Sequence, residues 1–238
     1  AISDVVGSPP DVIGSGPTVP DPTTYRDALE ALARRGVAVP PSVQTQLQGG
    51  AAGEHPETPK PGDPVFGRTE WHLVASVADA LQGATEEATR LGYPAAIVTD
   101  RMEGEARQVG REIAGLARSA RPPAALLLGG ETTVTVRGDG YGGRNQELAL
   151  AAAIALEGVP NVLVAALGTD GTDGPTDAAG AVVDGATVAR GRARGLDARN
   201  HLHRNDAYPF LEATGDLLLT GPTGTNVADL VLILVGPE

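Results

Sequence analysis

The stretch Ala124-Ala125-Leu126-Leu127-Leu128-Gly129-Gly130-Glu131-Thr132-Thr133 joins a short apolar run to glycines and polar residues. Such a run is typical of a buried strand, and the glycines after it let backbone N–H groups approach a ligand closely. Two further stretches repeat the pattern, since 162–167 leads into 168–174 and 216–219 leads into 220–226. In an open α/β sheet, ligands bind beyond the carboxyl ends of the strands. The three loops therefore predict one shared site for phosphate or carboxylate groups.

Strand-like and helix-like segments alternate along most of the chain. With 238 residues, 41% of them hydrophobic, the chain is long enough to bury a real core. Segments 103–119 and 144–156 have the pattern of helices, and Thr132–Arg137 alternates Thr with Val as a half-exposed strand would. We therefore predict an α/β fold, a three-layer α/β/α arrangement whose mixed sheet is mostly parallel.

The first part of the chain has a different character. Thr23 or Thr24 can cap a helix that runs to about Arg35, with Gly36 as its end. A polar run rich in Pro and Gly, from 48 to 67, is typical of a linker. We place the domain boundary near Gly62, which predicts one domain over 1–62 and a second over 63–238.

Composition argues against several classes of function. Aromatic residues make up 3% of the chain and the formal net charge is −12, both unfavourable for binding nucleic acid or an anionic membrane. Cysteine is absent from the sequence, which excludes disulfides and thiolate catalysis and fits a reducing, cytoplasmic environment. No apolar run approaches the roughly 20 residues of a membrane helix, and the run 230–235 is only as long as a strand. The single lysine, Lys60, stands between prolines, so phosphoryl chemistry here is not of the P-loop type.

The segment from Gly138 to Glu147 is the richest in candidate site residues. Its glycines lead into a predicted helix whose free N–H groups and dipole favour an anion, and Arg144 adds a bidentate fork. The alternative is a surface arginine paired with Glu147 or a nearby Asp. The same glycines match the dinucleotide fingerprint Gly-x-Gly-x-x-Gly, but the preceding strand would not be a buried one. A nicotinamide site is therefore the weaker interpretation.

Carboxylates gather in the second loop, at Asp170, Asp173 and Asp177. Mg²⁺ needs only one or two protein carboxylates when phosphates and water complete its shell, so Asp170 and Asp173 are candidate ligands. The alternative is that these residues make turns or cap a helix. His201 and His203 have no evident third partner, which argues against a zinc site.

Taken together, these motifs resemble the C-terminal domain of ATP-dependent glycerate kinases. This is the glycerate 2-kinase family, some members of which are labelled hydroxypyruvate reductases. The segments that carry the resemblance, in chain order, are 3–6, 15–21, 57–63, 129–136, 142–147, 168–171, 173–180 and 220–226. One departure is local, because Val77 stands where the family pattern leads us to expect Asn.

The resemblance implies transfer of the γ-phosphate of ATP to a hydroxyl of D-glycerate, with 2-phosphoglycerate as the expected product and this chain supplying the C-terminal half of the active site. Residues 1–62 would then be the end of a Rossmann-like N-terminal domain. Arg144 matches the family's catalytic arginine, and Asp170 and Asp173 are the expected Mg²⁺ ligands. The expected contacts to substrate or nucleotide are Gly130, Glu131, Thr132, Gly143, Asn145, Gln146, Thr169, Asp170, Thr223, Thr225 and Asn226.

The family's catalytic lysine lies in a first-domain segment that would precede Ala1, so we expect this chain alone to be inactive as a kinase. Three alternatives stay open for the missing N-terminal half: it is lost, disordered or supplied by another chain. The function has alternatives as well, namely an NAD(P)-dependent hydroxypyruvate reductase or a fragment that only binds ligand. The oligomeric state is open too, a homo-oligomer included.

Overall fold

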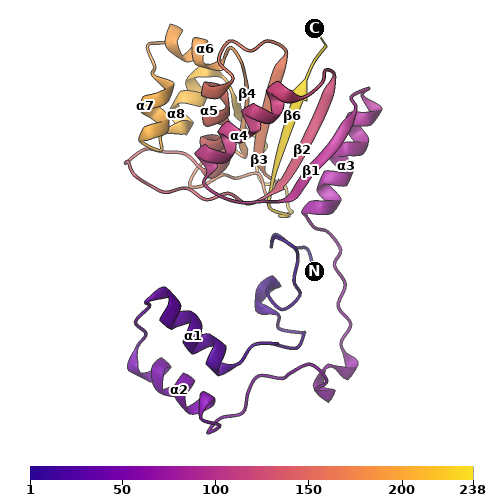
Figure 1. Ribbon diagram of the computed structural model, residues 1–238, viewed down its shortest axis with the longest axis vertical. Helices are drawn as coiled ribbons and strands as arrows, with labels where there is room; N and C mark the ends of the chain where they lie inside the picture. The colour runs from indigo at the N-terminus through magenta and orange to yellow at the C-terminus, as the bar shows by residue number, and fades with distance from the viewer. Residues whose placement is uncertain (238) are drawn as a thin grey trace. The chain divides into compact units, whose positions relative to one another are not determined.

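The structure, a computed structural model, describes residues 1–237 and groups them into two compact units. One unit consists of Ala1 and Pro9–His72. The other consists of Ile2–Ser8 and the chain from Leu73 onward. The second unit contains every strand and all three of the loops that predict a ligand site (Figure 1).

The smaller unit is built on two helices, α1 (Tyr25–Arg35) and α2 (Pro41–Ala51), with short 3-10 turns at Ile13–Ser15 and Pro64–Arg68. Helix α1 begins with a capping box between Thr24 and Asp27 and ends at Gly36, whose φ is 62°, as the sequence predicts. A Cβ on Gly50 would lie 2.3 Å from the Tyr25 ring, so glycine allows α2 to pack closely on α1. Lys60 bonds the carbonyl of Thr23 and the hydroxyl of Thr58, which tethers the segment after α2 to the start of α1.

The larger unit is built on a six-stranded sheet in the order β1-β2-β6-β3-β4-β5. Its strands are β1 (Ala95–Met102), β2 (Ala124–Gly130), β3 (Val162–Gly168), β4 (Gly180–Asp184), β5 (Leu217–Leu218) and β6 (Asp229–Val235). Only β1 and β2 pair in parallel, while the other neighbouring strands pair antiparallel. The α/β fold and the mixed sheet are confirmed, but the expectation of a mostly parallel sheet was wrong.

The order of the strands explains this difference. Strands β2 and β3 both pair antiparallel with β6, so they run in the same direction as each other. Helical crossovers thus keep β1, β2 and β3 in one direction, as expected for β-α-β connections. The last strand, β6, inserts between β2 and β3 in the opposite direction, and β4 separates β3 from β5 in the same way.

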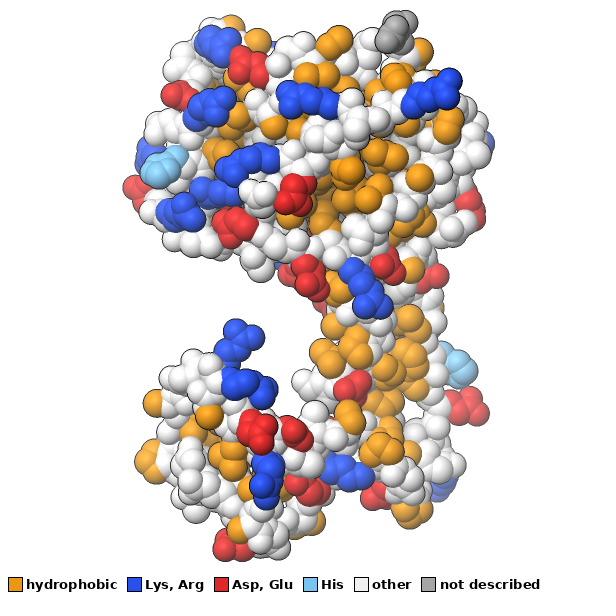
Figure 2. Space-filling view, in the orientation of Figure 1, with side chains coloured by type: hydrophobic (Ala, Val, Ile, Leu, Met, Phe, Trp, Pro, Cys, Tyr) orange, Lys and Arg blue, Asp and Glu red, His pale blue; other side chains and the backbone are white. Residues whose placement is uncertain are grey.

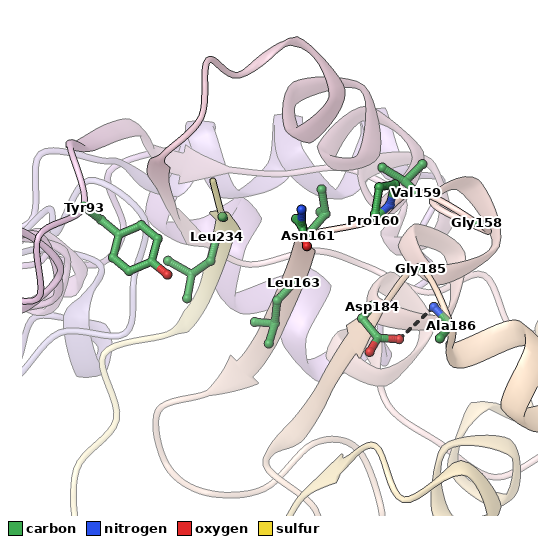
Figure 3. Close-up of a pocket in the computed structure, with 12 residues that line it drawn as sticks. Tyr93, Gly158, Val159, Pro160, Asn161, Leu163, Asp184, Gly185, Ala186 and Leu234 are labelled. Atoms are coloured by element: carbon green, nitrogen blue, oxygen red, sulfur yellow. Dashed lines mark hydrogen bonds between the residues drawn. The ribbon is translucent and has the colours of Figure 1, made fainter. Parts of the chain in front are cut away.

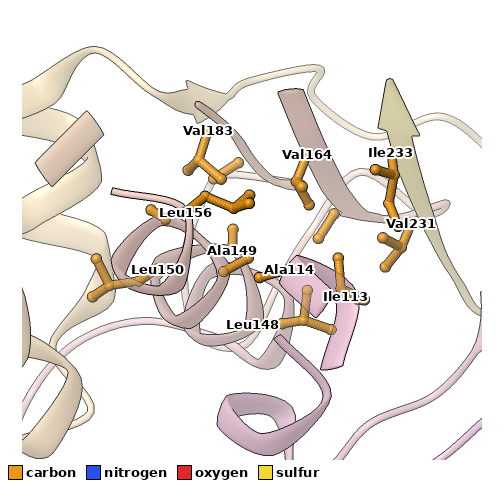
Figure 4. Packing of buried hydrophobic residues seen from close by; sticks show 14 of the residues in the cluster. Ile113, Ala114, Leu148, Ala149, Leu150, Leu156, Val164, Val183, Val231 and Ile233 are labelled. Carbon is orange, nitrogen blue, oxygen red and sulfur yellow. The ribbon is translucent and has the colours of Figure 1, made fainter. Parts of the chain in front are cut away.

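Helices cover both faces of the sheet, which gives the three layers that we predicted. Helix α3 (Val77–Arg90) packs on one face through Val77 and Leu81, against Leu127 of β2. Helices α4 (Ala106–Ser119) and α5 (Arg144–Ala155) pack on the other face, where the large buried core lies (Figure 4). The shorter helices α6 (Thr187–Ala193), α7 (Ala198–His203) and α8 (Ala207–Thr214) extend this second layer.

Residues 132–137, which we expected to form a strand, do so only at one isolated bridge between Thr133 and Glu105. Side chains take the place of a neighbouring strand here. The Glu105 carboxylate accepts bonds from the N–H and the hydroxyl of Thr135, and the Asn205 side chain accepts one from Arg137 N. The alternating Thr and Val residues therefore belong to a segment that hydrogen bonds with the Glu105 and Asn205 side chains hold in place.

The surface of the larger unit is mixed in character. Arginine side chains are scattered among apolar and acidic ones on the face shown in Figure 2. Within the described residues, we find no helix that is both long enough and apolar enough to cross a membrane.

Candidate active site

The three predicted loops leave the sheet at one edge. Strands β2, β3 and β5 run in the same direction, so the segments after Gly130, Gly168 and Leu218 all start there. Asp229, the first residue of β6, pairs with both Gly130 and Gly168 and so stands between two of the loops. Opposite strand directions thus place an acidic side chain at the centre of this edge.

Arg144, the first residue of α5, reaches this centre and binds two carboxylates. Asp229 holds it along one side, with Nε 2.6 Å from Oδ2 and Nη2 2.9 Å from Oδ1. Glu131 holds its outer end, with Nη1 2.9 Å from Oε1. The Asp229 side chain is 1% exposed, whereas that of Glu131 is 47% exposed. Arg144 is therefore fixed by a buried acid and capped by an exposed one.

These contacts strongly favour the charged form of Arg144. Its pKa is raised, first by the hydrogen bonds to Asp229 and then by the negative charges of Asp229, Glu131 and Asp173, although burial acts in the opposite direction. The guanidinium is also planar and rigid, so the Asp229 pair fixes its orientation. The Arg144 guanidinium is therefore permanently charged, and Asp229 at the start of β6 fixes its orientation.

The N-terminus of α5 is capped by Asp173, from the loop after β3. The Asp173 carboxylate accepts bonds from Asn145 N at 3.1 Å and Gln146 N at 2.9 Å. Its side chain is almost fully buried, and burial raises its pKa to about 6 against the opposing effect of these two N–H bonds. A Cβ on Gly143 would lie 2.3 Å from Asp173 Cγ, so the glycine before Arg144 permits this close approach. The helix-cap alternative for Asp173 is what the contacts show.

The loops after β3 and β5 are joined by hydrogen bonds. The Thr223 hydroxyl donates to Thr169 O at 2.6 Å, and Thr223 N donates to Asp170 O at 3.1 Å. The Thr169 hydroxyl in turn donates to Ala228 O at 2.7 Å and accepts from Val227 N at 2.8 Å. The hydroxyl groups of Thr169 and Thr223 thus bind backbone atoms and hold the two loops together.

Asp170, Thr225 and Asn226 line an open cavity of about 480 Å³ together with Asp4. The Asn226 amide donates to Asp4 Oδ2 at 3.0 Å, and Asp170 Oδ1 accepts from Thr172 N at 2.9 Å. Oxygen atoms therefore dominate this side of the site. Among the residues that the structure describes, no group of three or more His, Cys, Asp or Glu side chains has the arrangement of a metal centre.

A larger cavity, of about 540 Å³, borders Arg144 itself. It is lined by Glu131, Thr132, the glycines 140, 142 and 143, and the apolar side chains Val134, Val136, Pro175 and Ala207. Thr132 is 2% exposed, and within residues 1–237 its hydroxyl oxygen has no hydrogen-bond partner. This volume is within the range of about 300–1,000 Å³ that is usual for ligand pockets.

Buried charges support the glycine segment that borders this cavity. Arg107 Nε lies 2.9 Å from Glu147 Oε1, and Asn205 Nδ2 donates to Glu147 Oε2 at 2.8 Å. Asn205 Oδ1 accepts from Arg137 N and Gly138 N, which pins the start of the glycine segment. The Glu147 carboxylate is therefore held by Arg107 and Asn205, beside the glycine segment.

A further cavity, of about 520 Å³, lies at the opposite edge of the sheet (Figure 3). Its walls include Tyr93, Asn161 and Asp184, with Leu163 near the start of β3 and Leu234 near the end of β6. Those strand ends are the ones farthest from Gly168 and Asp229. We therefore place the candidate site at the Arg144 edge, where the predicted residues gather.

Most of the predicted site residues lie at this edge, but their contacts differ from one another. Glu131, Asp170, Thr225 and Asn226 reach open cavities, whereas Asn145 and Gln146 are fully buried beside Asp173. Sequence reasoning missed Asp229, whose only signal was a carboxylate at the head of the apolar run 230–235. The glycines at 138–143 follow an irregular segment, so the strand that a dinucleotide fingerprint requires is missing there.

Known proteins resemble this chain over nearly its whole length. Residues 124–229 match the model of the MOFRL family, and residues 1–48 match a domain of unknown function, DUF4147. A D-glycerate 2-kinase of Thermotoga maritima is 46% identical over 98% of this chain and 55% of its own length. A glycerate kinase of Macaca fascicularis is 34% identical over the whole chain and 72% of its own length.

The fold is also that of a solved relative. The crystal structure of the Thermotoga maritima glycerate kinase matches with a TM-score of 0.85 at 45% identity, over 98% of this chain and 56% of that one. This chain thus spans about half the length of these bacterial relatives. The resemblance seen in the motifs is confirmed, and the chain belongs to the glycerate kinase family.

Proposed function

We propose that this chain contributes the C-terminal half of the active site of a kinase that transfers the γ-phosphate of ATP to D-glycerate, with 2-phosphoglycerate as the product. The observation that carries the proposal is the guanidinium of Arg144. Asp229 orients it, and it lies at the edge of the sheet from which the three glycine- and threonine-rich loops leave. The names of the relatives support glycerate as the acceptor.

Phosphoryl transfer needs positioning and neutralisation of charge more than it needs a covalent intermediate. Arg144 meets both needs, because its orientation is fixed and its charge is permanent. The outer Nη1 and Nη2 atoms would contact the oxygens of the transferring phosphoryl group or the carboxylate of glycerate. Thr132, whose buried hydroxyl borders the larger cavity, would donate to a ligand oxygen there.

The acidic side of the site fits a divalent cation bound together with phosphates. Asp170 borders the open cavity near Thr225 and Asn226, and carboxylate and amide oxygens suit Mg²⁺. Both oxygens of Asp173 accept N–H bonds from α5, so Asp170 is the better placed of the two predicted ligands. When bound, Mg²⁺ would neutralise the charge of the nucleotide phosphates.

The test is Arg144→Lys in the purified protein that carries this chain, with ADP release measured in the presence of ATP and D-glycerate. Lysine keeps the charge but cannot reproduce the fork, so we expect turnover to fall by about two orders of magnitude or more. Arg111→Lys, on the outer surface of α4, is the matched control and should leave turnover unchanged. Unchanged kinetics for Arg144→Lys would remove Arg144 from the mechanism. NADH consumption with hydroxypyruvate, without ADP release, would favour the reductase instead.

A further inference from the structure

The two carboxylates on Arg144 differ in a way that matters for ligand binding. Asp229 uses the Nε and Nη2 side of the guanidinium and is buried, whereas Glu131 touches only Nη1 and is half exposed. Breaking the contact between Arg144 and Asp229 would leave a buried charge without its partner, which is strongly unfavourable. Breaking the contact between Arg144 and Glu131 costs little, since exposed ion pairs contribute about 1 kcal/mol or less.

The backbone of Glu131 is fixed while its side chain has room to move. Gly130 has a φ of 146°, and a Cβ there would lie 2.3 Å from Met102 O, so the chain turns tightly against β1. Glu131 N then donates to Met102 O at 2.8 Å. The side chain borders the cavity of about 540 Å³ and can rotate into it without disturbing the backbone.

We propose that Glu131 occupies, in the unliganded chain, the place on Arg144 that a phosphoryl anion takes when it binds. The Glu131 carboxylate binds Nη1 of the guanidinium and is displaced by the ligand, while Asp229 keeps the guanidinium oriented. Glu131 therefore sets the affinity of the site, because each anion must first displace it. This inference rests on the proposed function in one respect, namely that the ligand at Arg144 carries a phosphate.

The test compares Glu131→Gln with the wild-type chain by calorimetric titration with inorganic triphosphate in the presence of excess Mg²⁺, and with D-glycerate. Glutamine has nearly the same shape but no charge, so we expect triphosphate to bind more tightly, by up to about fivefold. Glu131→Asp keeps the charge but shortens the reach to Nη1, and it should fall between the two. Glu157→Gln is the matched control, because Glu157 forms a comparable exposed pair with Arg192 elsewhere on the unit, at 2.5 Å.

The outcomes separate this inference from the proposed function. Tighter binding by Glu131→Gln, with Glu157→Gln unchanged, supports the inference. Equal or weaker binding by Glu131→Gln overturns it and leaves the anion site at Arg144 standing. If neither triphosphate nor D-glycerate binds to the wild-type chain or to Glu131→Gln, both the inference and the proposed function fail.

Discussion

Asp173 offers a test of how the N-terminus of α5 is stabilised. Its pKa in the folded chain is about 6, against an ordinary value of 3.8, because burial disfavours the charged form. The folded state therefore holds this proton more tightly than the unfolded state does. By linkage, the contribution of Asp173 to stability is fully present below about pH 4 and is lost as the pH rises through about 6.

The size of the effect follows from the shift. One pKa unit corresponds to about 1.4 kcal/mol, so the difference between 3.8 and about 6 amounts to at most roughly 3 kcal/mol. The asparagine side chain in Asp173→Asn does not titrate. The free energy of unfolding of this variant, relative to wild type, should therefore increase by up to about 3 kcal/mol between pH 4 and pH 7.

The assay is urea unfolding of the whole chain, followed by far-UV circular dichroism at several pH values from 4 to 7. Asp139→Asn is a suitable control, because Asp139 is exposed and its hydrogen bond with Arg204 lowers its pKa. That variant should show a small change of the opposite sign. A constant difference between Asp173→Asn and wild type over this range would refute the reasoning.

Two further substitutions test the supports of the site by the same unfolding assay. Gly143→Ala places a methyl group 2.3 Å from Asp173 Cγ, so we expect a loss of about 1–3 kcal/mol, whereas Gly83→Ala, in an open part of α3, should be neutral or slightly stabilising. A Gly143→Ala protein as stable as wild type would show that α5 and the Asp173 loop can move apart freely. Glu147→Gln leaves the buried Arg107 charge without its nearest partner, and we expect a loss of about 3 kcal/mol. A loss well below 1 kcal/mol would mean that this pair is hydrated.

Local patterns predicted the elements better than their arrangement. The capping residues fixed the limits of α1, and the apolar runs located β2, β3 and β6 to within a residue or two. The direction of neighbouring strands was not predictable in the same way, because it depends on where β6 inserts. Nothing in the run 230–235 itself distinguishes a strand at the edge of a sheet from one between β2 and β3.

The location of the site was more predictable than the roles within it. Loops after strands of one direction meet at one edge whatever lies between them, so the convergence of the three glycine-rich segments survives the insertion of β6. Individual roles depend on tertiary contacts. The alternative role for Arg144 was a pairing with Glu147 or a nearby Asp, and its partner is Asp229, 85 positions away along the chain. Asp173 was a candidate metal ligand with a helix cap as the alternative, and its carboxylate accepts two N–H bonds at the start of α5.

The balance of charge around Arg144 bears on the ligand. A single guanidinium faces Asp229, Glu131 and Asp173, and Asp170 lies in the loop between β3 and Asp173. At neutral pH, above the pKa of about 6 of Asp173, carboxylates outnumber the cation. A bare polyphosphate would be repelled by this excess at short range, and burial would strengthen the repulsion. A phosphate that binds together with a divalent cation supplies the missing positive charge. We therefore expect the affinity for nucleotide to depend strongly on the Mg²⁺ concentration, because the charge of Arg144 alone does not balance the carboxylates.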